Sequence, residues 1–306
     1  MGTRSLSSRT AGLEQEATVR TGKRRRIRKG TGTPWVAVPY FAFVTAFLVV
    51  PLVANLWDTF FASGEFSSSA FLAVFEPQYR QSFLLTAQLS AVTALIGGVA
   101  GLALAWALAF TERPAWLKSA TTSFTALASQ SGGVQLSFAF IAALGTEGLL
   151  TQAAESILPG SMAGFSITSF TGVTLVYLYF QIPLMAILML PAMGSLRSSW
   201  YEAASSLGAT RVRYARDVIF PILWPSIAGS LLLLFANAFA AYATAYALTG
   251  GGLNLVPILI GFLISGNVLL DPALAASLVT WMMLVIITVM GLRALLVRRS
   301  SRWMNS

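Results

Sequence analysis

The sequence predicts an all-α integral membrane protein with six transmembrane helices and both termini in the cytoplasm. Three observations support this fold class: 56% of the 306 residues are hydrophobic, 10% are charged, and the mean hydropathy is +0.72. Soluble domains carry about 25% charged residues, so this chain has too few to cover a soluble surface. The chain also has no cysteine and no histidine, which excludes disulfides, thiolate metal sites and imidazole chemistry.

The apolar segments set the number of helices. A helix needs about 20 apolar residues to cross the hydrocarbon core of a bilayer. Six segments are long enough, and they cover residues 35–57, 82–110, 118–144, 168–194, 223–249 and 273–297. A seventh stretch, 255–269, is too short and contains Pro257, Gly261 and Gly266. We expect it to be a re-entrant or surface segment.

The basic residues lie on one side of these predicted spans. If the N-terminus is cytoplasmic, the cytoplasmic segments hold nineteen of the twenty Lys and Arg residues and five acidic residues. The outer segments hold only Arg80 and six acidic residues. This asymmetry follows the positive-inside rule. The net charge of +9 therefore indicates membrane orientation and argues against binding of nucleic acid.

The same pattern divides the chain into parts. Residues 1–33 are predicted to be a disordered basic cytoplasmic tail, and residues 34–80 hold the first transmembrane helix and an extracytoplasmic loop. The membrane core covers residues 81–297 and includes a long cytoplasmic loop at 195–222. Residues 298–306 form a second basic cytoplasmic tail.

The loop at 195–222 differs from the other connections because it has helix signals of its own. Residues 200–207 suit a short helix, for which Ser198 or Ser199 is a candidate N-cap. Gly208 is expected to end this helix, because glycine accepts the left-handed conformation of a C-terminal cap.

A second short helix is predicted after Gly208. It runs through Arg211 until Pro221 stops it. Two short helices at an angle, facing water on the cytoplasmic side, are suited to a groove on another protein.

The loop also carries a spaced motif, which reads Glu202-Ala203-Ala204, three residues, Gly208, nine residues, then Val218-x-Phe220-Pro221. It resembles the EAA loop of the permeases of ATP-binding-cassette (ABC) importers, whose pattern is Glu-Ala-Ala-x3-Gly-x9-Ile-x-Leu-Pro. Val218 and Phe220 are apolar replacements, and the spacing is kept throughout. The resemblance covers roughly residues 80–297 and implies the type I ABC-importer permease fold in a bacterial plasma membrane.

The resemblance also implies a function. The chain would be the non-enzymatic permease subunit of a binding-protein-dependent importer, with no metal and no cofactor of its own. Its expected partners are a cytoplasmic ABC ATPase dimer, a second identical or homologous permease, and an extracytoplasmic substrate-binding protein. ATP would be bound by the ATPase, because this chain lacks a Gly-x4-Gly-Lys-Ser/Thr phosphate loop. The residues expected to couple the permease to the ATPase are Glu202, Ala203, Ala204, Leu207, Gly208, Arg211, Val218 and Pro221.

A second stretch bears on the cargo. Residues 241–257 resemble the polyamine, opine, phosphonate and ferric-iron branch of the family. This resemblance implies a small polar solute such as a polyamine, a phosphonate or ferric iron. The sequence identifies neither the individual substrate nor whether the second permease is identical.

Uncharged polar side chains within the spans are candidates for the translocation path, namely Gln88, Gln181, Asn237, Tyr242 and Thr244. Asn237 and Thr244 share a face by helical spacing if the fifth span is continuous. Hydrogen bonding between helices is an equally good explanation for each of them. The Gly-containing stretch 131–135 in the third span is expected to be either a helix-packing site or a break in that span.

An ion-coupled secondary transporter is the alternative function. Such carriers place ionisable residues in mid-membrane, and the interiors of the six predicted spans have no Asp, Glu, Lys or Arg. Sodium sites built from backbone carbonyl groups keep this alternative open.

Overall fold

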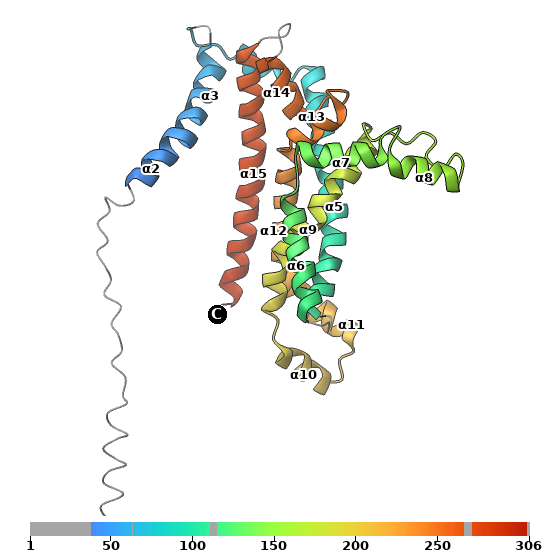
Figure 1. Ribbon diagram of the computed structural model, residues 1–306. Coiled ribbons are helices and arrows are strands. Elements are labelled where there is room, and N and C mark those ends of the chain that lie inside the picture. The colour runs from blue at the N-terminus through green and yellow to red at the C-terminus, as the bar shows by residue number, and fades with distance from the viewer. Residues whose placement is uncertain (1–37, 63, 111–114, 266–270, 305–306) are drawn as a thin grey trace, which may run out of the picture. The chain divides into compact units, whose positions relative to one another are not determined.

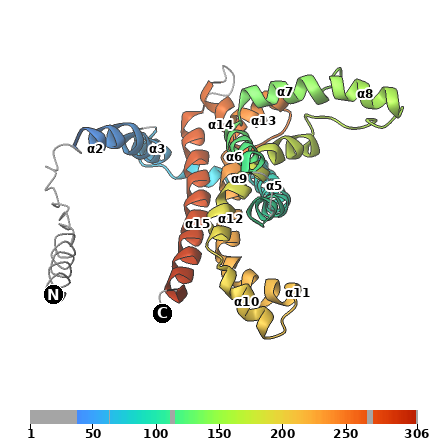
Figure 2. The same ribbon diagram turned by 60° about the horizontal axis from the view of Figure 1, so that its bottom comes forward.

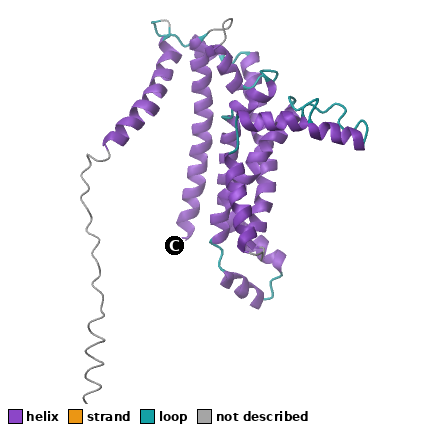
Figure 3. Ribbon diagram, in the orientation of Figure 1, coloured by secondary structure: helices purple, strands orange, loops and turns teal. Residues whose placement is uncertain are grey.

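The computed structural model describes residues 38–62, 64–110, 115–265 and 271–304, and every regular element in these ranges is a helix (Figure 3). The predicted tail at 1–33 lies outside them. The chain divides into two units, residues 1–52 and 53–306. Within the first unit, the described residues are helical and form α2 (Val38–Val44), the π-turn η2 (Thr45–Val49) and the start of α3 (Val50–Phe61).

The second unit continues α3 and forms a helical bundle (Figure 1). Its further elements are α4 (Ser69–Ala73), α5 (Pro77–Phe110), α6 (Ala115–Gln130), α7 (Val134–Leu144), α8 (Leu149–Ile157), α9 (Phe170–Gly194), α10 (Ser198–Ser206), α11 (Arg211–Tyr214), the π-turn η3 (Ala215–Ile219), α12 (Phe220–Phe239), α13 (Ala243–Thr249), α14 (Val256–Ser265) and α15 (Pro272–Met304). Helix α9 packs against α5, α6 and α12, and α12 also packs against α15. Helices α7 and α8 project to one side of this bundle, and α10 and α11 lie at one end of it (Figures 1 and 2).

Six helices in the described residues are long and apolar enough to cross a membrane, as predicted. They are Val38–Phe61, Pro77–Phe110, Val134–Ile157, Phe170–Gly194, Arg211–Phe239 and Pro272–Val297. The backbone of the last helix continues to Met304, beyond its predicted end at 297. The third and fifth spans differ more substantially from their predicted boundaries.

The third predicted span, 118–144, is not one helix. Helix α6 ends at Gln130, and α7 begins at Val134 after Gly133, whose φ of +97° is a conformation that residues with a side chain rarely adopt. The apolar stretch of spanning length is formed instead by α7 and α8 together. The expectation of a broken span at residues 131–135 is thereby confirmed.

The fifth predicted span, 223–249, both begins and ends differently. The helix starts at Arg211, twelve residues earlier, and stops at Phe239 before a short non-helical segment and α13. The short seventh stretch forms α14, whose Val256 and Ile258 are buried. Its backbone is tied to α5, since the Val256 N–H donates to Thr86 Oγ1 over 3.0 Å. The first turn of α14 is therefore packed inside the unit, whereas Ile264 and Ser265 at its end are exposed.

Polar side chains fasten the outer half of α3 to α15. Asn55 Nδ2 donates to Thr280 Oγ1 (3.1 Å) and to the Ala276 carbonyl (3.2 Å). The hydroxyls of Thr59 and Thr280, both buried, lie 2.9 Å apart. Such bonds are typical between membrane helices, where no water competes for the polar groups.

Glycines allow α5 and α9 to pack closely. A Cβ atom at Gly97 would lie 2.8 Å from the Cβ atom of Gln181 on α9. At Gly101, one turn further along α5, the added atom would lie 2.5 Å from the Cβ atom of Met185. Both distances are shorter than a carbon–carbon contact, so the two backbones can approach this closely only because these positions are glycine.

We expect Gly101→Ala to lower the apparent melting temperature of the purified protein in detergent. Overpacking of a tight contact costs about 1–3 kcal/mol. The matched control is Gly291→Ala on α15, where no atom lies within 4 Å of the added Cβ. The two variants melting at the same temperature would contradict the close-packing account.

Candidate coupling loop and polar cavity

The first helix of the cytoplasmic loop, α10, ends in a hydrogen-bonded cap at Gly208. The Gly208 N–H donates to the Ser205 carbonyl (2.9 Å), and the Ala209 N–H donates to the Ala204 carbonyl (3.0 Å). This pair of bonds is the Schellman motif, which requires a left-handed residue, and Gly208 has a φ of +80°. The predicted helix end at Gly208 is confirmed.

The start of α10 differs from the prediction. The helix begins at Ser198, and the N-cap position belongs to Arg197, whose side chain makes no capping bond. Neither Ser198 nor Ser199 therefore lies at the cap. The helix therefore begins two residues before the predicted range of 200–207.

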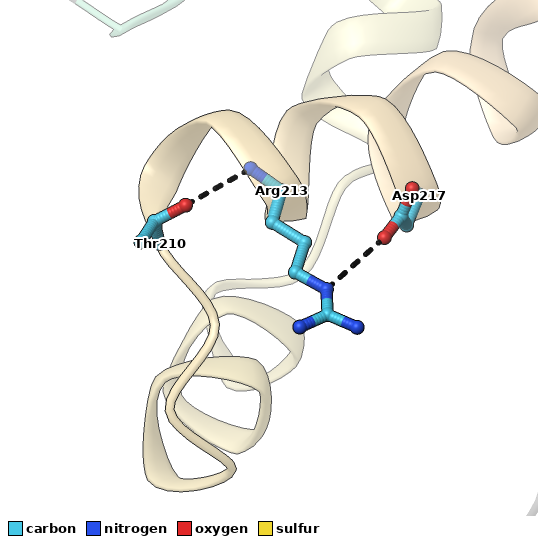
Figure 4. A network of polar contacts seen from close by, with 3 residues as sticks. All are labelled: Thr210, Arg213 and Asp217. Carbon is cyan, nitrogen blue, oxygen red and sulfur yellow. Dashed lines mark hydrogen bonds and ion pairs between the residues drawn. The ribbon is translucent and has the colours of Figure 1, made fainter.

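The second loop helix, α11, is capped by Thr210, whose Oγ1 accepts the Arg213 N–H over 3.3 Å (Figure 4). Arg213 Nε also lies 3.5 Å from Asp217 Oδ2, four residues further along. Both charged side chains are mostly exposed, so this ion pair contributes little stability. The Thr210 cap is the feature that fixes where α11 begins.

Pro221 does not stop the second helix, contrary to the prediction. Proline lacks the N–H that an α-helix needs, and its ring clashes with the carbonyl four residues back. Here the π-turn at Ala215–Ile219 precedes it, and the Phe220 N–H donates to the Ala215 carbonyl five residues back. The wider turn shifts the bonding by one residue, so the helix passes Pro221 and continues to Phe239.

An aromatic contact joins the two loop helices. The rings of Tyr201 on α10 and Tyr214 on α11 meet edge to face, with centroids 5.3 Å apart. Tyr214 also packs against the buried cluster that contains Met189, Met193 and Ile219. The loop is therefore braced against the bundle and not loosely attached to it.

The outer surface of the loop exposes apolar side chains. Leu207, directly before Gly208, is 89% exposed, and Val212 is 78% exposed. The other seven predicted coupling residues are also exposed or half-buried: Glu202, Ala203 and Ala204 on α10, Gly208 after it, Arg211 on α11, Val218 in η3 and Pro221 in α12. Glu202 has no ion pair within the described part of the chain. An almost fully exposed leucine on a braced helix end is a surface suited to a protein partner.

A polar cavity lies where the third and fifth apolar segments are broken. Its volume is about 330 Å³, and it is bordered by Ser129, Gln130, Gly132, Gly133, Phe180, Asn237, Ala240, Ala241, Tyr242, Ala243 and Thr244. The first four come from the end of α6 and the break before α7. Phe180 comes from α9, and the other six come from the end of α12, the break after it and the start of α13.

Three side chains hold the two breaks together. Thr244 Oγ1 accepts the Gly133 N–H over 2.8 Å, and Ser137 Oγ donates to the Thr244 carbonyl over 3.0 Å. Tyr177 on α9 donates its hydroxyl to the Ala241 carbonyl over 3.0 Å. The Gly133 N–H and the Ala241 carbonyl lie in the breaks, so two of these bonds satisfy backbone groups that the broken helices leave open, which is a requirement inside a membrane. The bond from Ser137 joins α7 to the first turn of α13.

The structure brings three of the five predicted path residues together at this cavity. Asn237 and Tyr242 are exposed at its edge, whereas Thr244 is buried and occupied by its bond to Gly133. The helix break lies between them, so the continuous-helix spacing used to group Asn237 with Thr244 does not apply.

The other two predicted residues lie elsewhere. Gln88 is exposed on α5 and does not border the cavity. Gln181 is fully buried between α9 and α12, where Nε2 donates to the Leu234 carbonyl over 3.0 Å. Interhelical bonding therefore accounts for Gln181, while its Oε1 has no partner among the described residues.

Sequence reasoning missed the backbone of the two breaks as part of the cavity. The adjacent glycines Gly132 and Gly133 were a usable signal, because glycine pairs weaken a helix. No comparable signal marks Ala240 and Ala241, since alanine is the best helix former.

Comparisons with known proteins agree with this architecture. A probable sulfate transport system permease protein (cysT) of Chlorella vulgaris is 28% identical over 175 residues, which cover 55% of this chain and 61% of the relative. A probable ABC transporter permease protein (y4fN) of Sinorhizobium fredii is 26% identical over 259 residues, covering 82% of this chain and 44% of the relative. The chain is a homologue of the ABC transporter permeases.

A solved structure supports the fold of this permease homologue over nearly its whole length. The bacterial alginate ABC transporter, in complex with a periplasmic protein bound to an alginate pentasaccharide, has a chain that superposes with a TM-score of 0.66 at 16% identity. The match covers 97% of this chain and 98% of that chain. The predicted permease fold is therefore confirmed. The six candidate spans and the permease relatives support the predicted multi-pass inner-membrane location.

The similarity to these relatives covers only part of their length. The permease homologue spans only 61% and 44% of the lengths of these two relatives, and no protein-family model matches it. One relative is named for sulfate, which lies outside the predicted polyamine, opine, phosphonate and ferric-iron branch. The relatives are ABC transporter permeases, and they define the branch only loosely.

We expect Thr244→Val in this permease homologue to loosen the joined helix breaks. Valine keeps the shape of threonine but cannot accept the Gly133 N–H, and loss of such a bond costs about 1 kcal/mol. The apparent melting temperature in detergent should fall by about 2–4 °C. Thr244→Ser keeps the acceptor and should melt close to wild type. A Thr244→Val protein as stable as Thr244→Ser would contradict this role.

Proposed function

We propose that this chain is the membrane-spanning permease subunit of a binding-protein-dependent ABC importer for a small polar solute. It pairs with a second permease, receives cargo from an extracytoplasmic binding protein, and is driven by a cytoplasmic ATPase dimer that binds ATP. The chain itself has no ATPase site. The observation that carries the proposal is the braced loop with Leu207 exposed beside Gly208.

The loop is proposed to dock into the ATPase. Leu207 and Val212 supply apolar surface for a groove, and Glu202 supplies a carboxylate for a basic group on the partner. The hydrogen-bonded cap at Gly208 and the Tyr201–Tyr214 contact keep the two helices at a fixed angle. A rigid element transmits a displacement that a flexible loop would absorb.

The continuous helix from Arg211 to Phe239 gives that displacement a direct route. One end of this span carries the docking surface, and the residues after its other end, Ala240–Tyr242, border the polar cavity. Closure of the ATPase dimer would therefore move the cavity wall without passing through a loop. In this proposal the cavity belongs to the translocation path.

The second permease is proposed to close the open side of the cavity. Non-helical backbone at membrane depth is tolerated only where it faces protein or a water-filled space. Gly132 and Ala240 lie in the two breaks and are exposed. The Ala240 N–H is bonded to the Ala236 carbonyl, but the non-helical backbone at Gly132 would face lipid unless a second chain or an aqueous path lies beside it.

The alternative, an ion-coupled carrier, is not favoured. Among the described residues, no Asp, Glu, Lys or Arg borders the cavity, so an ion or proton would have no ionisable partner there. An ion-coupled carrier also needs no docking surface for an ATPase, so the exposed leucine on the braced loop favours the importer.

The proposal is tested by Gly208→Ala and Gly194→Ala, with the chain co-expressed with an ATPase and a binding protein encoded beside it. No atom lies within 4 Å of a Cβ added at either glycine, but only Gly208 has a positive φ. Alanine in that conformation costs about 1–2 kcal/mol and disrupts the angle between the loop helices. ATP-dependent uptake into membrane vesicles should be reduced for Gly208→Ala and unchanged for Gly194→Ala.

Two further variants extend this test. Gly208→Pro and Glu202→Ala should abolish uptake and weaken ATPase co-purification while the permease still inserts into the membrane. Uptake that persists without the ATPase, or normal transport by all the loop variants, would refute the importer proposal and favour the ion-coupled carrier.

A further inference from the structure

We infer that the polar cavity and the aromatic rings beside it form a contact site for an uncharged, hydroxyl-rich organic solute, such as a saccharide or polyol. The inference rests on the proposed function, because it assigns a substrate class to the proposed path. It depends on separate observations, which concern the side chains at the cavity and not the coupling loop.

The polar groups at the cavity are amides and hydroxyls. Gln130 and Asn237 are exposed at its edge, and neither side chain has a hydrogen-bond partner among the described residues. Each amide offers donors as well as acceptors, so each can bind a hydroxyl in either direction. Tyr242 adds a phenol at the same edge.

An aromatic surface continues the cavity along α13 and α14. The rings of Tyr242 and Tyr246 stack with centroids 5.4 Å apart and an angle of 20° between their planes. Phe262 on α14 meets Tyr246 edge on, at 5.9 Å and 67°. Both tyrosines remain about two-fifths exposed, so ring surface that the stack leaves uncovered can contact the apolar side of a sugar ring.

The Phe262 and Tyr242 rings pack directly against two glycines. A Cβ at Gly251 would lie 2.6 Å from the Phe262 ring, and one at Gly261 would lie 3.0 Å from the Tyr242 ring. Each ring therefore fills space that any side chain at the glycine would occupy. Together with the bonds of Thr244, Ser137 and Tyr177 at the breaks, this packing makes the site rigid before a solute arrives.

The charge of the site sets the substrate class. None of the residues that border the cavity is Asp, Glu, Lys or Arg. A polyamine, a phosphonate or a metal complex would enter without a countercharge, and desolvating a charge without a partner is costly. A neutral polyol needs only hydrogen bonds and ring contact, and the cavity offers both. Its volume of about 330 Å³ lies within the usual range for small-molecule sites.

The absence of cysteine from the sequence allows a direct test. Ala243→Cys, at an exposed position on the cavity border with no side-chain role in the proposed site, would be the only thiol in the full-length chain, which would be purified and placed in lipid nanodiscs. Labelling by an uncharged hydrophilic maleimide would be timed with maltose, sodium sulfate or spermidine as the probe, over one concentration range and at matched ionic strength. Ser161→Cys, on an exposed loop away from the cavity, is the matched control.

We expect maltose to slow labelling of Ala243→Cys about fivefold when it fills four-fifths of the sites, and to leave Ser161→Cys unchanged. Sulfate and spermidine should have no such effect. Adding Tyr242→Ala should remove the protection by maltose, whereas Tyr242→Phe, which keeps the ring, should retain most of it.

Absence of maltose protection while Ala243→Cys labels normally would overturn this inference, as would stronger protection by sulfate or spermidine. Those outcomes leave the importer proposal intact, because ATP-dependent uptake by the loop variants is measured separately. An Ala243→Cys thiol that never labels would show that the cavity is closed to water, and it would overturn both the contact site and the assignment of the cavity to the path.

Discussion

One continuous helix, from Arg211 to Phe239, connects the cytoplasmic loop to the polar cavity. The proposed coupling between the two depends on this helix. Two prolines, Pro221 and Pro225, lie within this stretch, and each would ordinarily cost an α-helix about 3 kcal/mol or more. The π-turn at Ala215–Ile219 lets the helix pass the first of them. Without this continuity, a movement of the loop would end at the membrane surface.

The second constraint is the supply of hydrogen bonds to backbone groups inside a membrane. Two breaks at the same place would be costly if their backbone groups were left without partners. Thr244, on the helix after one break, accepts the Gly133 N–H of the other break, and Tyr177 on α9 donates to the Ala241 carbonyl. The polar cavity is the space that remains beside this joint.

Patterns that depend on local chemistry could be predicted from the sequence. Gly208 was identified as a helix end because the left-handed conformation there requires glycine, and the number of spans followed from apolar length. Features that depend on neighbouring helices could not be predicted in this way. Pro221 signals a helix stop on its own, and only the preceding π-turn reverses that signal. Gln88 and Gln181 are polar residues in apolar segments like Asn237, and only the packing of α5, α9 and α12 separates the three.

The central claim is that the tip of the loop contacts the ATPase. The most direct measurement replaces Leu207 with a photo-crosslinking amino acid in the co-expressed transporter and identifies the crosslinked product. The control places the same amino acid at Leu158, which is also exposed but lies in the segment after α8, remote in the chain from the loop. We predict a crosslink to the ATPase from position 207 and none from position 158. A crosslink from position 207 to lipid alone, or equal crosslinking from both positions, would contradict the account.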